Sequence, residues 1–257
     1  MFRSKLRKLL PIAVFVALAI PAAFVTLPAL ADDTGKSSDD SRIVGGGTVP
    51  ASTKTPWIVA LHNNGDFRCT STQISRNWIL TAAHCVTTGG KYKARIGAKT
   101  RSSGGKVIDI STIKIHPKYQ QGNLYDIAVI KLKTPHTNTY PKLAFSKSHL
   151  KLGQASTIYG WGATKADWTG PLPEKLKYSK GKTTKKYCEM PEDVCVIGDG
   201  AVAGGDSGGP VFIKSASTGK TMLAGACEAG HNPANWKWGG YASTVFHQKW
   251  IKGTTDL

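Results

Sequence analysis

Short apolar runs alternate with clusters of glycine, proline, asparagine and serine along most of the chain. The runs are rich in valine, isoleucine, leucine and aromatic residues, which is typical of β-strands bounded by turns. The clearest runs cover residues 57–61, 73–74, 77–80, 107–110, 127–132, 156–159, 209–213 and 221–227. Many short strands at near-regular spacing predict an all-β barrel or sandwich.

Helical spacing is found only at the end of the chain, where residues 244–251 predict a short C-terminal helix. Residues 133–155 are rich in turn-forming residues and have no clear strand pattern. We interpret this stretch as the boundary between two halves of similar size.

The first 31 residues have the pattern of a secretory signal peptide. Four basic residues precede position 9, the segment from Pro11 to Leu30 is uncharged, and small residues follow at Ala29 and Ala31. The alternative is a membrane anchor, but the three prolines and the small-residue exit disfavour it. No later stretch is long and apolar enough to cross a bilayer. We therefore expect a secreted, extracellular protein in which disulfides can form.

Residues 32–42 are polar and acidic, and they end at Arg42, directly before Ile43-Val44-Gly45-Gly46. The composition of this segment predicts a short leader or pro-segment with no apolar side chains to bury.

Composition excludes a disordered chain, because 40% of the 257 residues are hydrophobic and only 19% are charged. The 34 basic and 16 acidic residues give a formal net charge of +18. The basic residues are dispersed without interleaved aromatics, so we expect no specific nucleic-acid binding. They indicate either a solvated surface or attraction to acidic polymers or surfaces. No metal cluster, phosphate-binding loop or nucleotide fingerprint is found, so we expect no metal and no cofactor.

Three motifs carry reactive residues: TAAHC at 81–85, DIAVIKL at 126–132 and GGDSGGP at 204–210. A serine hydroxyl is a weak nucleophile until a base takes its proton, and a histidine oriented by a carboxylate can be that base. Glycines beside the serine allow backbone N–H groups to approach a substrate oxygen. Each motif alone has a plainer explanation: His84 as a core histidine, Asp126 as a strand-edge residue and Ser207 as part of a turn.

Together, and in this order after RIVGG, the motifs resemble those of the chymotrypsin-like (trypsin family) serine proteases. Gly160-Trp161-Gly162 and Tyr241, nine residues before Trp250, match two further landmarks of the family. The resemblance covers residues 43–257, which we expect to be one serine protease domain. It implies two six-stranded antiparallel β-barrels with the active site in the cleft between them.

The resemblance also implies roles for individual residues. Ser207 matches the nucleophile, His84 the general base and then acid, and Asp126 the carboxylate that orients it. The N–H groups of Gly205 and Ser207 match the oxyanion hole. Residues 32–42 would be an activation peptide, removed by a protease that cuts after Arg42, and the new ammonium of Ile43 would pair with Asp206.

The family pairs cysteines at the positions of Cys69 and Cys85, and Cys188 with Cys195 matches a second, short bridge. Cys227 is left over, because Ala203 stands where the family often has its partner. We expect Cys227 to be a buried free thiol. The signal exit and the few cysteines fit a bacterial exported enzyme.

The specificity pocket departs from trypsin, because Ala201 stands where trypsin-like members carry an aspartate. Gly230 and Gly239 match the pocket walls. Without an acid on the floor, we expect an apolar preference rather than cleavage after lysine or arginine. Another protease would then be needed to cut at Arg42.

Glu228 and Ala229 replace a serine and a tryptophan of the family pattern. Glu228 has three interpretations: a carboxyl beside Asp126 with one raised pKa, a recognition group for a basic substrate, or a solvent-exposed residue. Loss of the tryptophan at Ala229 removes an apolar wall for the substrate.

The sequence therefore favours a secreted serine endopeptidase that acts on protein or peptide substrates and is made as a zymogen. One rival hypothesis is a catalytically impaired homologue that acts as a binding protein. Another is a basic adhesive protein, which salt-sensitive retention on an anionic matrix would reveal.

Overall fold

The computed structural model describes residues 43–120, 125–188 and 190–257. The signal peptide predicted at 1–31 and the activation peptide predicted at 32–42 lie outside these residues. In the described part of the chain, no helix has the length and apolar character needed to cross a membrane.

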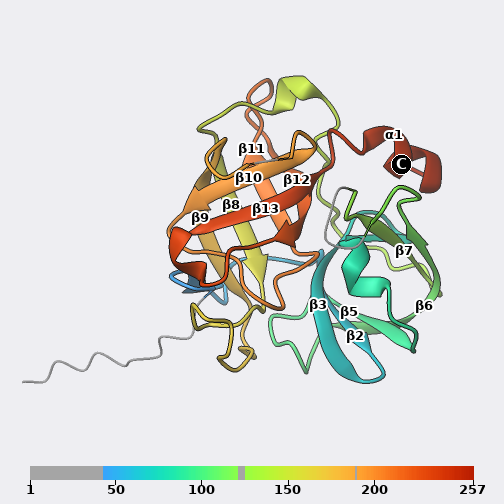
Figure 1. The fold of residues 1–257 in the computed structure, drawn as a ribbon. Helices are drawn as coiled ribbons and strands as arrows, with labels where there is room; N and C mark the ends of the chain where they lie inside the picture. The colour runs from blue at the N-terminus through green and yellow to red at the C-terminus, as the bar shows by residue number, and fades with distance from the viewer. Residues whose placement is uncertain (1–42, 121–124, 189) are drawn as a thin grey trace, which may run out of the picture. The chain divides into compact units, whose positions relative to one another are not determined.

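The first half of the protein forms a closed antiparallel β-barrel (Figure 1). Its strands are β2 (Ile58–Asn63), β3 (Asp66–Gln73), β4 (Trp78–Thr81), β5 (Tyr92–Ile96), β6 (Lys106–Ile115) and β7 (Ala128–Leu132). In β5, buried and exposed side chains alternate, as expected for a strand with one face on the core. In β2, Val59 and Leu61 face the barrel interior, whereas Ile58 and Ala60 pack outside it against Trp161. This two-sided burial explains why β2 is a continuous apolar run.

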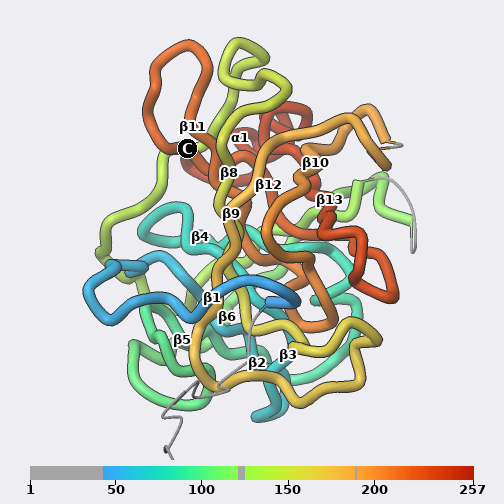
Figure 2. Tube along the Cα trace, turned by 90° about the vertical axis from the view of Figure 1, so that its left-hand side faces the viewer, coloured from blue at the N-terminus to red at the C-terminus, as the bar shows by residue number. Residues whose placement is uncertain are grey.

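The second half forms another barrel of six antiparallel strands. They are β8 (Ala155–Gly160), β9 (Lys177–Thr184), β10 (Asp193–Gly198), β11 (Pro210–Lys214), β12 (Thr221–Ala229) and β13 (Trp238–Ser243). The ring closes because β8 pairs with both β9 and β11. A short strand β1 (Gly47–Thr48) adds to the outside of β9, and Figure 2 shows the two side by side. The prediction of an all-β fold with two six-stranded barrels is confirmed.

A separate hydrophobic cluster joins the barrels. It combines Trp78, Leu80 and Val129 of the first barrel with Phe212 and Leu223 of the second. Residues 133–154 connect β7 to β8 and contain the one-turn 3-10 helix η2 (Lys147–His149). Because this shared cluster is apolar and buried, it fixes the two barrels against each other.

The C-terminal helix α1 is Gln248–Thr254, a few residues later than the predicted 244–251. Residues before it form turns instead, because the Thr244 hydroxyl donates to the carbonyl of Ala144. The Ser243 hydroxyl accepts the N–H of Val245. These side-chain bonds satisfy the backbone in a non-helical form. After α1, Asp256 accepts the indole N–H of Trp78 at 3.1 Å, which attaches the chain end to the first barrel.

Candidate active site

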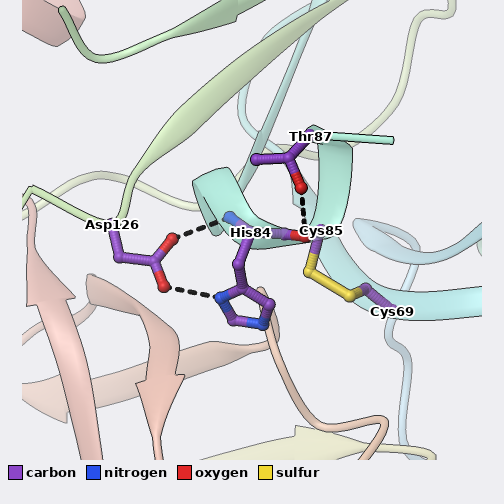
Figure 3. A network of polar contacts seen from close by, with 5 residues as sticks. All are labelled: Cys69, His84, Cys85, Thr87 and Asp126. Carbon is purple, nitrogen blue, oxygen red and sulfur yellow. Dashed lines mark hydrogen bonds and ion pairs between the residues drawn. A yellow bond between two sulfur atoms is a disulfide. The ribbon is translucent and has the colours of Figure 1, made fainter. Parts of the chain in front are cut away.

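His84 lies on the 3-10 helix η1 (Ala83–Val86), directly after β4. Its Nδ1 is 2.5 Å from Oδ2 of Asp126, and its backbone N–H donates to Oδ1 of the same carboxylate at 2.9 Å (Figure 3). Asp126 precedes β7, which pairs with β4, so the neighbouring strands bring the two residues together. The double contact fixes the imidazole, with Nδ1 bonded to Asp126 and the opposite ring edge directed away from it.

Ser207 lies in the loop before β11 and lines the same cavity as His84 and Asp126. This cavity has a volume of about 300 Å³ and lies between the two barrels. Residues predicted from three distant motifs are thus brought to one place: His84 and Asp126 from the first barrel, and Ser207 from the second.

The backbone around Ser207 leaves two N–H groups free. The Gly204 carbonyl accepts from Ala163, and the Asp206 carbonyl accepts from Gly209. In a trans peptide plane, the carbonyl and the N–H that follows it point in opposite directions. Because the carbonyls of Gly204 and Asp206 point toward their donors, the N–H groups of Gly205 and Ser207 point away from these donors. Within the described residues, neither group donates to an internal acceptor. Two unpaired donors beside a hydroxyl are what a negatively charged oxygen needs.

Asp206, the neighbour of Ser207, points inward and is only 2% exposed. Its carboxylate accepts the N–H of Gly162 at 2.8 Å and that of Ala203 at 2.9 Å. A Cβ on Gly162 would lie 2.2 Å from Oδ2 of Asp206, so this position needs glycine. Burial raises the pKa of Asp206 to about 7, because these two N–H groups only partly offset the loss of water.

Ile43 is fully buried in the core of the second barrel. The carbonyl of Val44 accepts the N–H of Ala201, which forms a β-bridge there. Gly45 has φ +86°, and a Cβ there would lie 2.5 Å from the carbonyl oxygen of Asp199. The segment that follows Arg42 is therefore tightly packed. Arg42 itself lies outside the described residues, so the ion pair between Ile43 and Asp206 stays a prediction.

The side of the cavity next to Ser207 is lined mainly by apolar groups. Its lining includes Val202, Gly230 and an indole, that of Trp168, which the sequence analysis did not single out. Ala201 is buried to 1% exposure and is not among the lining residues, nor is Gly239. Val202 packs against Gly239, because its two methyl groups would lie 3.0 and 3.2 Å from a Cβ built there.

Glu228 also lines the cavity, and its carboxyl interacts with that of Asp193 on β10. Burial raises the pKa of Glu228, and the neighbouring Asp193, Asp126 and Glu192 raise it further. Burial also raises the pKa of Asp193. A buried carboxyl beside other acids holds its proton more tightly, so the structure favours the interpretation of a perturbed acid near Asp126 over a solvent-exposed residue. The sequence analysis missed Asp193, although Glu192-Asp193 directly before an apolar strand was a signal for it.

The five cysteines form two disulfides and leave one thiol. Cys69 is bonded to Cys85 with an S–S distance of 2.06 Å, which attaches η1 to β3, and Cys188 is bonded to Cys195. Cys227 is free and buried, as expected, and burial raises its pKa. His84 lies near the sulfurs of Cys69 and Cys85. This group does not suit a metal ion, because both sulfurs are oxidised and Nδ1 of the histidine is bonded to Asp126.

Comparison with known proteins identifies relatives along most of the chain. A family model described as Trypsin matches residues 43–251. Trypsin alpha-4 of Lucilia cuprina is 30% identical over 229 residues, which cover 82% of this chain and 87% of that protein. Trypsin beta of Drosophila erecta is 28% identical over 229 residues, covering 82% and 88%. These relatives are insect proteins and give no support to the bacterial source inferred from the signal exit.

A solved structure gives the same result for the fold. Neuropsin, a serine protease expressed in the limbic system of mouse brain, superimposes with a TM-score of 0.69 at 26% identity. The match covers 81% of this chain and 98% of that chain. The sequence and fold comparisons cover nearly the same share of the chain. The chain therefore belongs to the Trypsin family of chymotrypsin-like serine proteases, and it is a serine endopeptidase that acts on proteins or peptides.

Proposed function

We propose that this protein is a secreted endopeptidase made as a zymogen, with His84, Asp126 and Ser207 as its catalytic triad. The observation that carries the proposal is the 2.5 Å contact between His84 and Asp126 at the cavity that Ser207 lines. A fixed imidazole beside a serine is what an activated nucleophile requires.

In the proposed reaction, the Ser207 hydroxyl attacks the carbonyl carbon of the scissile peptide bond while His84 takes its proton at Nε2. The oxygen that becomes negative is stabilised by the free N–H groups of Gly205 and Ser207. His84 then gives the proton to the leaving amine, which produces an acyl-enzyme. Water, deprotonated by the same histidine, hydrolyses the ester. Asp126 stabilises the charged imidazole in both steps.

Activation by cleavage after Arg42 is supported by the surroundings of Asp206. Among the described residues, this buried carboxyl has two backbone N–H partners and no cationic one. A free ammonium on Ile43, which belongs to the same half of the protein, would supply the missing positive charge. The resulting ion pair would hold the loop that carries Ser207 in its working form. The substrate preference is proposed to be apolar, because Trp168, Val202 and Gly230 line the cavity beside Ser207 and carry no charge.

Secretion is supported by the two disulfides, which form in oxidising compartments. The proposed activator is a separate protease that cleaves after arginine, since this pocket does not favour basic side chains.

Covalent labelling tests the proposal. The secreted proform, beginning at residue 32, is cut after Arg42 with trypsin, and the trypsin is then removed. Cut and uncut protein are treated with a fluorophosphonate probe beside the variants Ser207→Ala and Arg42→Gln. We expect labelling of the cut wild type only. Ser103→Ala, a change of an exposed serine outside the cavity, is the matched control and should label fully.

A correctly cut and folded protein that does not label would overturn the proposal and favour the impaired homologue that acts as a binding protein. Folding is checked separately by circular dichroism, so loss of structure is distinguished from loss of chemistry. Labelling of the uncut protein at the same rate would overturn only the zymogen part.

A further inference from the structure

Trp168 lies across the side of the cavity next to Ser207. A Cβ built on Gly230 would be 3.2 Å from its Cζ2 atom, and a Cβ built on Gly204 would be 3.8 Å from its Cε3 atom. These two atoms are opposite corners of the six-membered ring of the indole. The ring therefore fills the gap between the segment before Ser207 and the end of β12, which are the two walls beside the nucleophile.

Val202 fills the same slot from its inner end. Its Cγ2 atom would lie 2.8 Å from a Cβ on Gly230, and both of its methyl groups would contact a Cβ on Gly239. Val202 is 3% exposed and belongs to the core of the second barrel, so its position is fixed by packing. Trp168 and Val202 therefore both line the part of the cavity beside Ser207 that a substrate side chain would enter.

The loop that carries Trp168 is attached to both walls. Ala163 donates its N–H to Gly204 at 2.8 Å, and Ala234, which follows β12, donates to the carbonyl of Ala166 at 2.7 Å. Asp167 accepts the N–H and the hydroxyl of Thr169, which closes a turn around the tryptophan. The indole Nε1 is buried and has no hydrogen-bond partner in the described part of the chain. Apolar contact and these loop bonds therefore hold the ring in place.

We propose that Trp168 and Val202 together restrict the endopeptidase to substrates with a small side chain, such as alanine or glycine, on the acyl side of the cleaved bond. The proposal rests on the proposed function, in which Ser207 attacks the carbonyl of that residue. The substrate side chain then enters the slot beside Ser207, where the ring and the methyl groups exclude larger side chains.

The test uses protein cut after Arg42 and peptide anilides that differ only in the residue before the anilide. Active enzyme is first counted by fluorophosphonate labelling, and kcat/KM is then measured for alanine and phenylalanine substrates. We expect the wild type to prefer alanine by at least about tenfold, the scale of size discrimination in apolar pockets. Trp168→Ala should lower this preference by at least about tenfold, mainly through faster cleavage after phenylalanine. Trp168→Leu repeats the test if the alanine variant does not fold.

Trp236→Ala is the matched control, because Trp236 is 42% exposed and does not line the cavity. It should leave the preference unchanged. Absence of labelling in the wild type overturns the proposed function itself. If the wild type is labelled but prefers the phenylalanine substrate, this inference alone is overturned. The same holds if the ratio of kcat/KM for the two substrates is unchanged in Trp168→Ala. If kcat/KM rises equally for both substrates in Trp168→Ala, the inference is also overturned, because the ring then blocks the site without selecting by size.

Discussion

The buried carboxyl of Asp206 should make the uncut chain less stable as the pH rises from about 4 to about 7. Burial raises its pKa from the ordinary value of 3.8 to about 7. Within this range, folded protein retains a proton that unfolded protein has lost. Because the folded pKa is the higher one, the stabilisation is complete below the unfolded pKa and is lost as the pH rises through the folded pKa.

The magnitude follows from the two pKa values. At about 1.4 kcal/mol for each tenfold difference in proton affinity, pKa values of 3.8 and about 7 correspond to a loss of about 4 kcal/mol. Asp206 is 2% exposed, so screening by solvent hardly reduces this figure. The titratable groups nearby are Cys227 and Tyr241, and burial raises the pKa of both. They stay uncharged in the same pH range and do not contribute.

Urea unfolding measures the effect. The proform is prepared with Ser207→Ala to prevent self-cleavage, with and without Asp206→Asn, and the free energy of unfolding is compared at about pH 4.5 and about pH 7.5. The aspartate protein should lose about 3 kcal/mol more than the asparagine protein between these conditions, because this pH range covers most but not all of the titration. Asp199→Asn, a change of an exposed carboxyl, is the control and should behave like the parent. A difference between the aspartate and asparagine proteins below about 1 kcal/mol would refute the reasoning. In protein cut after Arg42, the Ile43 ammonium should remove the dependence.

Three further predictions concern the same cleft. Gly162→Ala places a Cβ 2.2 Å from the Asp206 carboxylate, so fluorophosphonate labelling should fall by at least about tenfold, whereas Gly253→Ala, which meets no atom within 4 Å, should label normally. Replacing both Cys69 and Cys85 with alanine opens a loop of 16 residues and should lower the free energy of unfolding by about 3 kcal/mol; a loss under 1 kcal/mol in urea would contradict this. Glu228→Gln replaces the carboxyl with a neutral amide that can still donate to Asp193. Because Glu228 is expected to carry a proton already, the acid limb of the pH–rate profile should stay in place. A downward shift of this limb by about one pH unit would indicate instead that Glu228 is ionised beside Asp126.

The fold was predictable because its strands are short apolar runs that turn signals separate, and because three motifs gave the family. The apolar pattern did not predict the residue at which the C-terminal helix begins. Thr244 and Ser243 bond the backbone through their side chains, and these bonds depend on where Ala144 lies in space. The position of a helix start thus depended on a contact between residues 100 positions apart.

The candidate site shows the same limit. His84, Asp126 and Ser207 carry signals in their own local sequences, so each could be picked out before the fold was known. The interaction between Glu228 and Asp193 could not be predicted, because it joins β12 to β10 across β13. The position of Trp168 could not be predicted for a related reason. Its neighbours Gly204 and Gly230 have no side chains, and the local sequence does not show which residue packs against them.

Three departures from the family pattern, at Ala203, Glu228 and Ala229, line the cavity, and the structure offers a replacement for two of them. At Ala203, where the family often has a cysteine, the loop is held by reciprocal bonds: Ala203 donates to the Asp206 carboxylate, and Asp206 donates back to the Ala203 carbonyl at 3.0 Å. At Ala229, where the family has a tryptophan, the small side chain leaves room in the cavity, and the indole of Trp168 enters from another loop. An impaired homologue would have lost these supports without replacement. Because Asp206 braces the loop at Ala203 and Trp168 adds an apolar ring to the cavity that Ala229 lines, these two departures are more consistent with a changed specificity than with a lost activity.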